Sequence, residues 1–479
     1  MKTKYRNPMY LWTTKNALYR LLFSAFWLLL LTLLFLLNSC DDFVRVDLPG
    51  SQLTAAAVYE DPITADAAMT DVYAKLRDGG LLNGGATGLS FLMGTYADEL
   101  DFYGNSQNGA VAFYQNSLLA SNSDVKNLWD ASYNQIYGAN AVIEGVTNST
   151  SLSAATRAQL KGEALFVRAL VHFYLSTTFG AVPYITSTDY EYNRHVSRMP
   201  VASLHAAVQD DLEASILLLP EDYVSSDRTR PNRYAAHALL ARVALYAGLW
   251  NEASDEASAV LNHTALYSTV TDLDAVFLKE SPSTVWQFSS SAIGGNTLEA
   301  GTFNFVVGPP PLAALTSDFM TSFEANDLRK THWTNSVSDG TTTWYHPYKY
   351  KANGDSGSAV EFTVVLRMGE LYLIRAEARV RAGDLIGGKE DLNIVRHLAG
   401  LNDTTAMSAS ALLDSILAER RVELFCEFGH RFFDLKRFNQ VQPVLSAVKS
   451  GWNATDVLFP IPDSELNLNP NLAPQNAGY

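Results

Sequence analysis

Ala241-Arg242-Val243-Ala244, which lies seven residues before Gly248, decides how this chain folds. Small side chains let two helices pack closely, and glycine readily ends a helix in the left-handed conformation. Ala376-Glu377-Ala378-Arg379 lies seven residues before Gly383 in the same way. A second segment with helical periodicity follows each glycine. The sequence therefore predicts two helix–turn–helix pairs.

Apolar residues at helical spacing predict helices elsewhere too. The expected helices cover residues 64–77, 126–146, 155–179, 201–219, 233–247, 251–261, 364–382, 388–398 and 410–428. This pairing is the pattern of tetratricopeptide (TPR) repeats. Since the two similar segments are 135 residues apart, they are not a tandem array. We expect a mainly α fold, a TPR-like superhelix of helical pairs, with Trp129, Tyr133, Phe173 and Leu371 buried.

Two segments break the helical pattern. Residues 81–120, with the stretch from Leu81 to Leu118 expected to form loops, are rich in glycine, asparagine and aromatic residues. Residues 267–360 combine glycine and proline with many Trp, Tyr and Phe residues. Such punctuation indicates long loops and short strands. We therefore expect an N-terminal helical region at 59–266, a loop-rich insertion at 267–360, and a helical region with a tail that wraps the surface at 361–479.

The first forty residues resemble a bacterial lipoprotein signal. Five cations and no acid precede the apolar run from Leu21 to Leu37, and Leu37-Asn38-Ser39-Cys40 follows. This is the order of an export signal with a cleavage site. We expect residues 1–39 to be removed, Cys40 to carry acyl chains, and residues 40–58 to form the lipid anchor and an extended tether. The alternative is a transmembrane anchor, since seventeen apolar residues just span a bilayer.

Charge and cysteine content exclude some functions. The chain has a net charge of −15, and removal of residues 1–39 takes away five cations and leaves −20. Such an acidic protein repels phosphate backbones, so we expect no nucleic-acid partner. Cys40 and Cys426 are the two cysteines. With Cys40 acylated, no disulfide can form within the chain.

Several motifs in a fixed order resemble the SusD/RagB family across nearly the whole mature chain. They are Cys40-Asp41-Asp42-Phe43, Asp47-Leu48-Pro49, Gly162-Glu163-Ala164-Leu165-Phe166-Val167-Arg168-Ala169, Phe179-Gly180-Ala181-Val182-Pro183, Glu370-Leu371-Tyr372-Leu373-Ile374-Arg375-Ala376-Glu377-Ala378, Glu419-Arg420-Arg421-Val422-Glu423-Leu424, Gly429-His430-Arg431-Phe432-Phe433-Asp434-Leu435-Lys436-Arg437, Phe459-Pro460-Ile461-Pro462 and Gln475-Asn476-Ala477-Gly478-Tyr479.

The resemblance implies a surface lipoprotein that binds a glycan or a peptide. Such a protein hands its ligand to a SusC-like TonB-dependent transporter, and lipidated Cys40 would hold it to the outer membrane, facing the cell exterior. We expect a glycan ligand. A peptide ligand is the main alternative, and a surface glycan hydrolase is a further one.

Enzymatic interpretations of the charged motifs are weaker. Glu423, Glu427 and His430 could form an acid–base or metal cluster, but a zinc helix of the HExxH type needs a second histidine. Helix-surface ion pairs, such as Arg420 with Glu423, explain these charges better. Asp98, Glu99 and Asp101 are paired carboxylates in a predicted loop, yet a glycosidase needs two carboxylates across a sugar from each other. We expect no catalytic residue, no metal and no cofactor.

Aromatic residues in the predicted loops are the remaining candidates for a ligand site. Sugars present flat C–H faces that stack on aromatic rings, while amides and carboxylates bind their hydroxyls. Loops on a rigid scaffold are the usual place for such a site. The predicted ligand-binding residues are Tyr96, Asp98, Tyr103, Asn105, Trp333, Trp344 and Tyr345.

Overall fold

The computed structural model describes residues 10–36, 55–355 and 357–479 of the chain. The chain divides into two compact units, Met1–Thr54 and Ala55–Tyr479. The first contains α1 (Tyr10–Leu36). Within the described ranges, none of the helices has both the length and the apolar character needed to cross a membrane. Cys40 and the start of the predicted tether lie outside the described residues.

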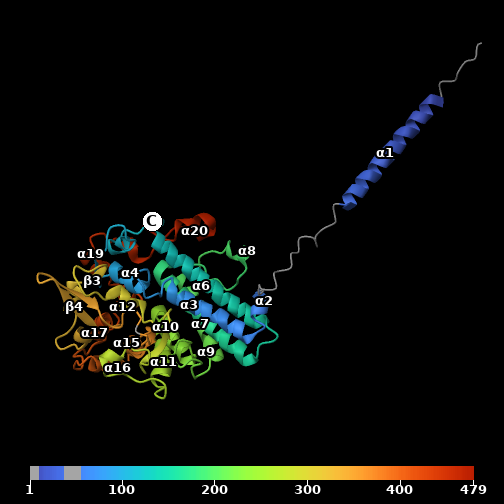
Figure 1. Ribbon diagram of the computed structural model, residues 1–479. Coiled ribbons are helices and arrows are strands. Elements are labelled where there is room, and N and C mark those ends of the chain that lie inside the picture. Colours follow the sequence, from blue (N-terminus) through green and yellow to red (C-terminus); the bar gives the residue numbers. More distant parts are fainter. Residues whose placement is uncertain (1–9, 37–54, 356) are drawn as a thin grey trace, which may run out of the picture. The chain divides into compact units, whose positions relative to one another are not determined.

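Most of the second unit is a series of packed helices (Figure 1). The main ones are α2 (Ala55–Val58), α3 (Pro62–Asp78), α6 (Ser123–Asn148), α7 (Ala154–Phe179), α9 (Val201–Leu218), α10 (Arg233–Ala247), α11 (Trp250–Leu261), α15 (Met368–Ala382), α16 (Leu385–Leu398) and α17 (Ala409–Glu423). Each packs on the next, from α3 through α6, α7, α9, α10 and α11 to α15, and α15 contacts both α16 and α17. This continuous stacking confirms the predicted mainly α, TPR-like architecture.

The two predicted helix–turn–helix pairs are α10 with α11 and α15 with α16. Gly248 and Gly383 end their first helices with φ values of +77° and +97°, in the left-handed region that suits glycine. Because α11 also packs on α15, the two pairs are neighbours in space despite their separation in sequence. A buried ion pair joins them, since Arg242 of α10 donates to both carboxylate oxygens of Glu370 of α15 at 2.8 and 2.6 Å.

Shorter elements fill the regions between the main helices. They are α4 (Leu89–Tyr96), β1 (Leu100–Phe102), α5 (Ala110–Tyr114), α8 (Tyr190–Asn193), η1 (Leu273–Ala275), β2 (Thr284–Phe288), α12 (Leu298–Phe303), β3 (Ala313–Leu315), α13 (Ser317–Thr321), α14 (Arg329–His332), β4 (Thr334–Ser338), β5 (Thr343–Pro347), β6 (Thr363–Arg367), α18 (His430–Arg437), α19 (Val441–Val448), η2 (Ala454–Val457), α20 (Asp463–Leu468) and η3 (Pro470–Leu472). Two antiparallel sheets result, one in the order β1-β3-β5-β4 and one of β2 with β6.

The prediction of loops from Leu81 to Leu118 is wrong in part, because α4 and α5 lie there. Every residue of α4 is buried. A helix that is buried on all sides lacks the apolar stripe by which sequence periodicity is recognised. The segment Leu89-Ser90-Phe91-Leu92 therefore shows no helical signal.

Two predicted helix boundaries are also wrong. Residues 363–367 form β6 instead of the first turn of a helix, because the β-branched residues Thr363 and Val364 favour a strand and pair with β2. The helix expected at 410–428 ends at Glu423. Cys426 and Phe428 then take left-handed φ values of +54° and +44°, which a helix cannot contain.

The predicted core residues Trp129, Phe173 and Leu371 are buried, which confirms the packing scheme. Tyr133 is only half-buried, and its hydroxyl donates to the Pro183 carbonyl at 2.9 Å. The C-terminal tail does more than wrap the surface, because Phe459 and Ile461 belong to the main hydrophobic core.

Candidate functional site

The four-stranded sheet presents the exposed aromatic residues of the predicted site. The backbone N–H of Tyr103 continues the β1–β3 pairing by donating to the Leu312 carbonyl at 2.7 Å. On the other side of β3, Leu315 pairs with Tyr345 of β5. The sheet thus carries residues from the 81–120 segment and from the insertion side by side.

Tyr103 and Trp344 lie on the same face of this sheet. Side chains alternate along a strand, and directly paired residues share a face. By this register, Tyr103 shares a face with Asp101, whereas Leu315 and its partner Tyr345 lie on the other face. Trp344 is next to Tyr345 and therefore lies on the face of Tyr103, as does its partner Val337 of β4. Tyr103 is 43% exposed and Trp344 is half-buried. Because strand β3 lies between their two strands, they suit different units of an extended ligand better than one sugar ring.

Tyr345 cannot join the face that carries Trp344, because it is the next residue of the same regular strand. It pairs with Ser336 of β4 and is 36% exposed on the opposite face. Asn105 is exposed two residues beyond Tyr103, where its side chain accepts from the Gln107 N–H at 3.0 Å. The sheet therefore places Tyr103 and Trp344 on one face, with Asn105 two residues beyond Tyr103, and separates Tyr345 from them.

Tyr96 and Trp333 do not have an exposed ring face, which corrects two of the predicted ligand contacts. Tyr96 is fully buried between Phe432 and Phe459, with ring centroids at 5.3 and 5.2 Å. The Trp333 indole is also buried and donates to the Leu273 carbonyl at 3.0 Å. Both rings are core residues, because they fill the junction between loops and helices.

Asp98 is a buried ion-pair partner, which corrects its predicted ligand role. Its carboxylate accepts from Arg431 at 2.8 and 2.7 Å and from Arg421 at 2.9 Å. Although burial favours the neutral form, these two guanidinium groups lower the pKa of Asp98. Burial and the Asp98 charge raise the pKa of the neighbouring Glu99 to about 7. Neither carboxyl group reaches solvent, so the two cannot flank a glycosidic bond.

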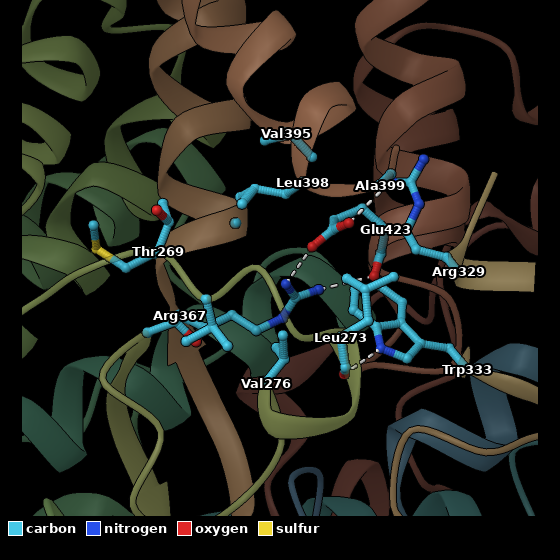
Figure 2. A pocket seen from close by; sticks show the side chains of 14 residues that line it. Thr269, Leu273, Val276, Arg329, Trp333, Arg367, Val395, Leu398, Ala399 and Glu423 are labelled. Atoms are coloured by element: carbon cyan, nitrogen blue, oxygen red, sulfur yellow. Dashed lines mark hydrogen bonds and ion pairs between the residues drawn. The ribbon is translucent and has the colours of Figure 1, made fainter. Parts of the chain in front are cut away.

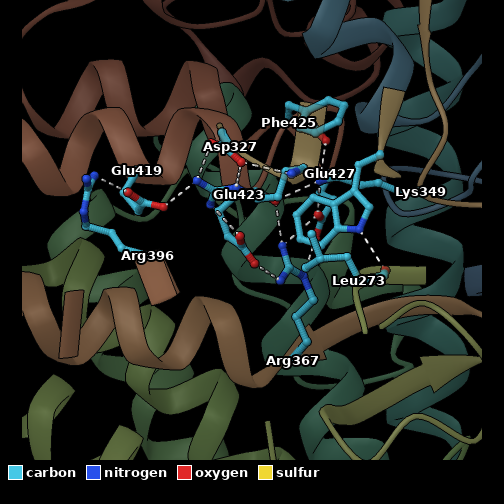
Figure 3. A network of polar contacts seen from close by, with 11 residues as sticks. Leu273, Asp327, Lys349, Arg367, Arg396, Glu419, Glu423, Phe425 and Glu427 are labelled. Atoms are coloured by element: carbon cyan, nitrogen blue, oxygen red, sulfur yellow. Dashed lines mark hydrogen bonds and ion pairs between the residues drawn. The ribbon is translucent and has the colours of Figure 1, made fainter. Parts of the chain in front are cut away.

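A network of buried charges links α17 to α14, to β6 and to the residues that follow β5 (Figure 3). Its centre is Glu423 of α17, which accepts from Arg367 at the end of β6 at 2.5 Å and from Arg329 of α14 at 2.8 Å. Lys349, which follows β5, donates to the Glu423 carbonyl at 2.8 Å and to the Glu427 carboxylate at 2.5 Å. Although burial of the Glu423 carboxyl group favours its neutral form, the two guanidinium groups hold its pKa at about 2.

This network replaces the helix-surface ion pairs expected in the charged C-terminal motif. Arg420 contacts Asp434 at 2.7 Å instead of Glu423, and both side chains are buried. Sequence spacing could not predict the true partners, because those of Glu423 lie 56 and 94 residues away. The network ties α14, β5 and β6 to α17, and so holds the exposed sheet on the helical scaffold.

A small cavity lies against the same charges (Figure 2). Arg329, Trp333, Arg367 and Glu423 line it together with aliphatic residues, and its volume is about 30 Å³. This is room for a water molecule but far below the volume of roughly 300 Å³ at which ligand pockets begin. In the part of the chain that the structure describes, no group of three His, Cys, Asp or Glu side chains is placed to hold a metal ion.

Sequence reasoning left a carbohydrate or cation contact open for the loop carboxylates but did not include Asp101 among the ligand-binding residues. Asp101 is half-buried, lies on the face that Tyr103 shares, and accepts a hydrogen bond from the Tyr114 hydroxyl at 3.3 Å. Sequence reasoning also missed the loop before β3. Val306 and Val307 are exposed in this loop, and Gly308 lies against the Trp344 ring. The alternation of residues 100–103 was the available signal for Asp101, but four residues are too few to establish it.

Comparison with known proteins agrees with this architecture. A family model described as "Starch-binding associating with outer membrane" matches residues 59–245, and the model of the SusD family matches residues 266–479. The chain belongs to the SusD/RagB family. The first match ends within α10 and the second begins after α11, so both helical regions carry the family pattern.

Relatives share modest identity over most of their length. A SusD-like protein, P25, of Formosa agariphila is 22% identical over 93% of this chain and 97% of that protein. A second protein of that organism, SusD-like protein P2, is 26% identical over 75% of this chain and 81% of that protein.

Solved structures of the family share the fold. A SusD superfamily protein from Bacteroides vulgatus superposes with a TM-score of 0.76 at 22% identity, over 88% of this chain and 99% of that one. A laminarin-binding SusD-like protein gives 0.70 at 22% identity, over 87% and 99%. A surface glycan-binding protein A from Bacteroides fluxus gives 0.72 at 21% identity, over the same shares.

The buried network predicts the effect of Arg367→Met. This change removes a charge that faces Glu423 and Glu427, and breaking a buried ion pair costs about 3–5 kcal/mol. We expect a loss of that size in the free energy of unfolding, measured by urea denaturation. Lys126→Met, which breaks the exposed pair with Asp130, is the control and should cost less than about 1 kcal/mol. Equal costs for the two variants would contradict a supporting role for the network.

Glu99 predicts a pH dependence of stability. Because its folded pKa of about 7 lies above the ordinary value of 4.5, the folded state binds a proton that the unfolded state releases between these pH values. The free energy of unfolding should therefore fall as pH rises from 5 to 8, by up to about 3 kcal/mol from this group. Glu99→Gln cannot ionise, and its oxygen can still accept from the Cys426 N–H.

The measurement is urea denaturation of parent and Glu99→Gln at pH 5, 6.5 and 8. The variant should gain stability over the parent as pH rises. Glu191→Gln changes an exposed carboxylate and should follow the parent at each pH. Parallel curves for the parent and Glu99→Gln would show that Glu99 is not protonated in the folded protein.

Proposed function

We propose that this chain is a cell-surface glycan-binding lipoprotein that delivers oligosaccharides to a SusC-like TonB-dependent transporter of the outer membrane. The observation that carries the proposal is that Tyr103 and Trp344 lie on one face of the β1-β3-β5-β4 sheet. Asp101 and Asn105 lie two residues before and after Tyr103. The rings supply stacking surfaces for sugar C–H faces, and the carboxylate and amide supply acceptors and donors for hydroxyls.

The family supports this ligand class. SusD-like proteins form a carbohydrate-binding family, and similar folds include a laminarin-binding protein and a surface glycan-binding protein. The sheet surface suits ligand specificity, because its residues come from the loop-rich segments. Peptide binding is the alternative that the same experiments would detect.

Binding without hydrolysis fits the state of the acidic residues at this site. Asp98 and Glu99 are buried, and Asp98 is paired with two arginines. Asp101 is the one member of this acidic trio that reaches solvent. A glycosidase mechanism of the usual kind requires two carboxyl groups on either side of the scissile bond, so the exposed face suits retention of a glycan better than its cleavage.

Substitution of the exposed rings tests the ligand site. Trp344→Ala and Tyr103→Ala should each weaken binding to the glycan identified on a glycan and peptide array, by about tenfold to a hundredfold if base–aromatic stacking energies apply to sugars. Isothermal titration calorimetry measures the affinity, and analysis of released sugars measures turnover. Tyr345→Ala alters an exposed ring on the opposite face and is the matched control.

Parent-like affinity in both Trp344→Ala and Tyr103→Ala would place the glycan elsewhere. Steady release of cleaved sugars by the parent would favour the hydrolase alternative. Binding of peptides with no glycan bound would favour peptide uptake.

Cys40→Ala tests the anchor. Without the acylated thiol, the exported protein should leave the outer membrane and appear in soluble fractions, because acyl chains supply the membrane affinity. Cell fractionation with immunoblotting measures this, and protease treatment of intact cells then tests whether the parent faces outward. A Cys40→Ala protein that remains in the membrane would support the transmembrane alternative. Cys426→Ala, which alters the buried cysteine, is the control and should remain anchored.

A further inference from the structure

A second concave site lies between α6, α8 and α20, away from the sheet. Its volume is about 310 Å³, which reaches the range of small-molecule pockets, roughly 300–1,000 Å³. In Figure 1, α8 and α20 lie at the upper right of the helical body, whereas β4 lies at its left. Neither Tyr103 nor Trp344 is among the residues that line this pocket.

Tyrosine and tryptophan rings form one wall of the pocket. Trp129, Tyr133 and Tyr137 occur at intervals of four residues along α6, so they lie along one face of the helix. Tyr137 is 55% exposed, and Tyr190 of α8 is 70% exposed across the pocket. The rings thus range from a buried base at Trp129 to an open rim. Such a gradient leaves ring surface available to a ligand.

The other walls are fixed by hydrogen bonds between distant segments. Asn140 of α6 donates to the Ile185 carbonyl at 3.0 Å, and Tyr133 donates to that of Pro183. From the C-terminal tail, Asn469 donates to the Val196 carbonyl at 2.8 Å. These bonds hold residues 183–196 between α6 and the tail. The pocket is therefore preformed, as small-molecule sites usually are.

Two hydrogen-bond acceptors line the pocket, and one of them has no donor. The Asn193 amide donates to the Ser187 carbonyl at 2.7 Å, but its side-chain oxygen is buried with no hydrogen-bond partner among the described residues. Buried polar atoms are normally paired, so this oxygen needs a donor. The Glu465 carboxylate, half-buried in the opposite wall, is a second acceptor; it already accepts from Trp129 at the base of the pocket and has lone pairs left for further donors. Hydroxyl groups can donate to both acceptors while the carbon skeleton contacts the rings.

We propose that this pocket is a second saccharide-binding site, which holds a sugar unit of the same glycan that the sheet surface binds. The proposal rests on the proposed function, because it assigns the same class of ligand to a separate place. Neutral sugars combine hydroxyl donors with apolar C–H faces, and this is the combination that Asn193, Glu465 and the tyrosines accommodate. Two sites on one chain would raise the affinity for a long glycan above that of either site.

Affinity electrophoresis of the full-length protein in detergent, through gels containing laminarin or soluble starch, tests the pocket. The variant Tyr137→Ala with Tyr190→Ala changes two exposed rings and should keep the fold. Its apparent affinity should fall about tenfold or more, the loss expected for one to two stacked rings. Tyr192→Ala is the matched control. Tyr192 lies on α8 with Tyr190, is 68% exposed and does not line the pocket.

The sheet variant, Tyr103→Ala with Trp344→Ala, separates this proposal from the proposed function. It should retain weak binding, which the two pocket substitutions then abolish. If the pocket variant is retarded like the parent and the sheet variant is not retarded, the pocket proposal alone is overturned. If the parent binds neither polymer, the glycan function fails for glucans and the pocket proposal falls with it. Loss of binding to casein peptides with unchanged retardation by glucans would make the pocket a peptide site and would also overturn the proposal.

Discussion

The buried carboxylate of Glu423 determines how the loop-rich part of this protein is attached to the helical scaffold. It is buried, and it stays ionised because Arg329 and Arg367 donate to its two oxygens from separate elements. Two charges taken out of water are stable only when their geometry is good and their remaining donors are satisfied. The arginines therefore have to lie where α17 presents its last turn, and α14 and β6 take their positions accordingly.

Rigid placement of the exposed sheet follows from this constraint. Strand β5 is followed by Lys349, which caps the carbonyls of Glu423 and Phe425, and α14 leads into β4 through Trp333. The chain segments before and after the β4–β5 hairpin are thus both held by the same buried cluster. A short hairpin would gain little stability from its own contacts. Its attachment to the scaffold allows ring faces such as that of Trp344 to be presented in a defined orientation.

Much of the scaffold could be predicted from the sequence, because local rules determine it. Gly248 and Gly383 end helices for conformational reasons that act within a few residues, and the helices that they end carry clear apolar patterns. The buried helix α4 and the strand β6 were missed, since their surroundings, not their patterns, select their structure. The site was predicted only in part. Tyr103 and Trp344 are accessible, whereas Tyr96 and Trp333 are buried by contacts with residues hundreds or tens of positions away.

Secondary structure decides which aromatic rings can act on one ligand. Trp344 and Tyr345 are adjacent in sequence, yet the twofold period of a strand turns them to opposite faces. Trp129, Tyr133 and Tyr137 are spread over nine residues, yet the helical period gathers them on one wall. Aromatic density in a sequence is therefore a poor guide to a sugar site, because the count of rings on a common face depends on the period of the element that carries them. The loops of this chain hold more aromatic residues than α6, but many of those rings stabilise the junction with the scaffold.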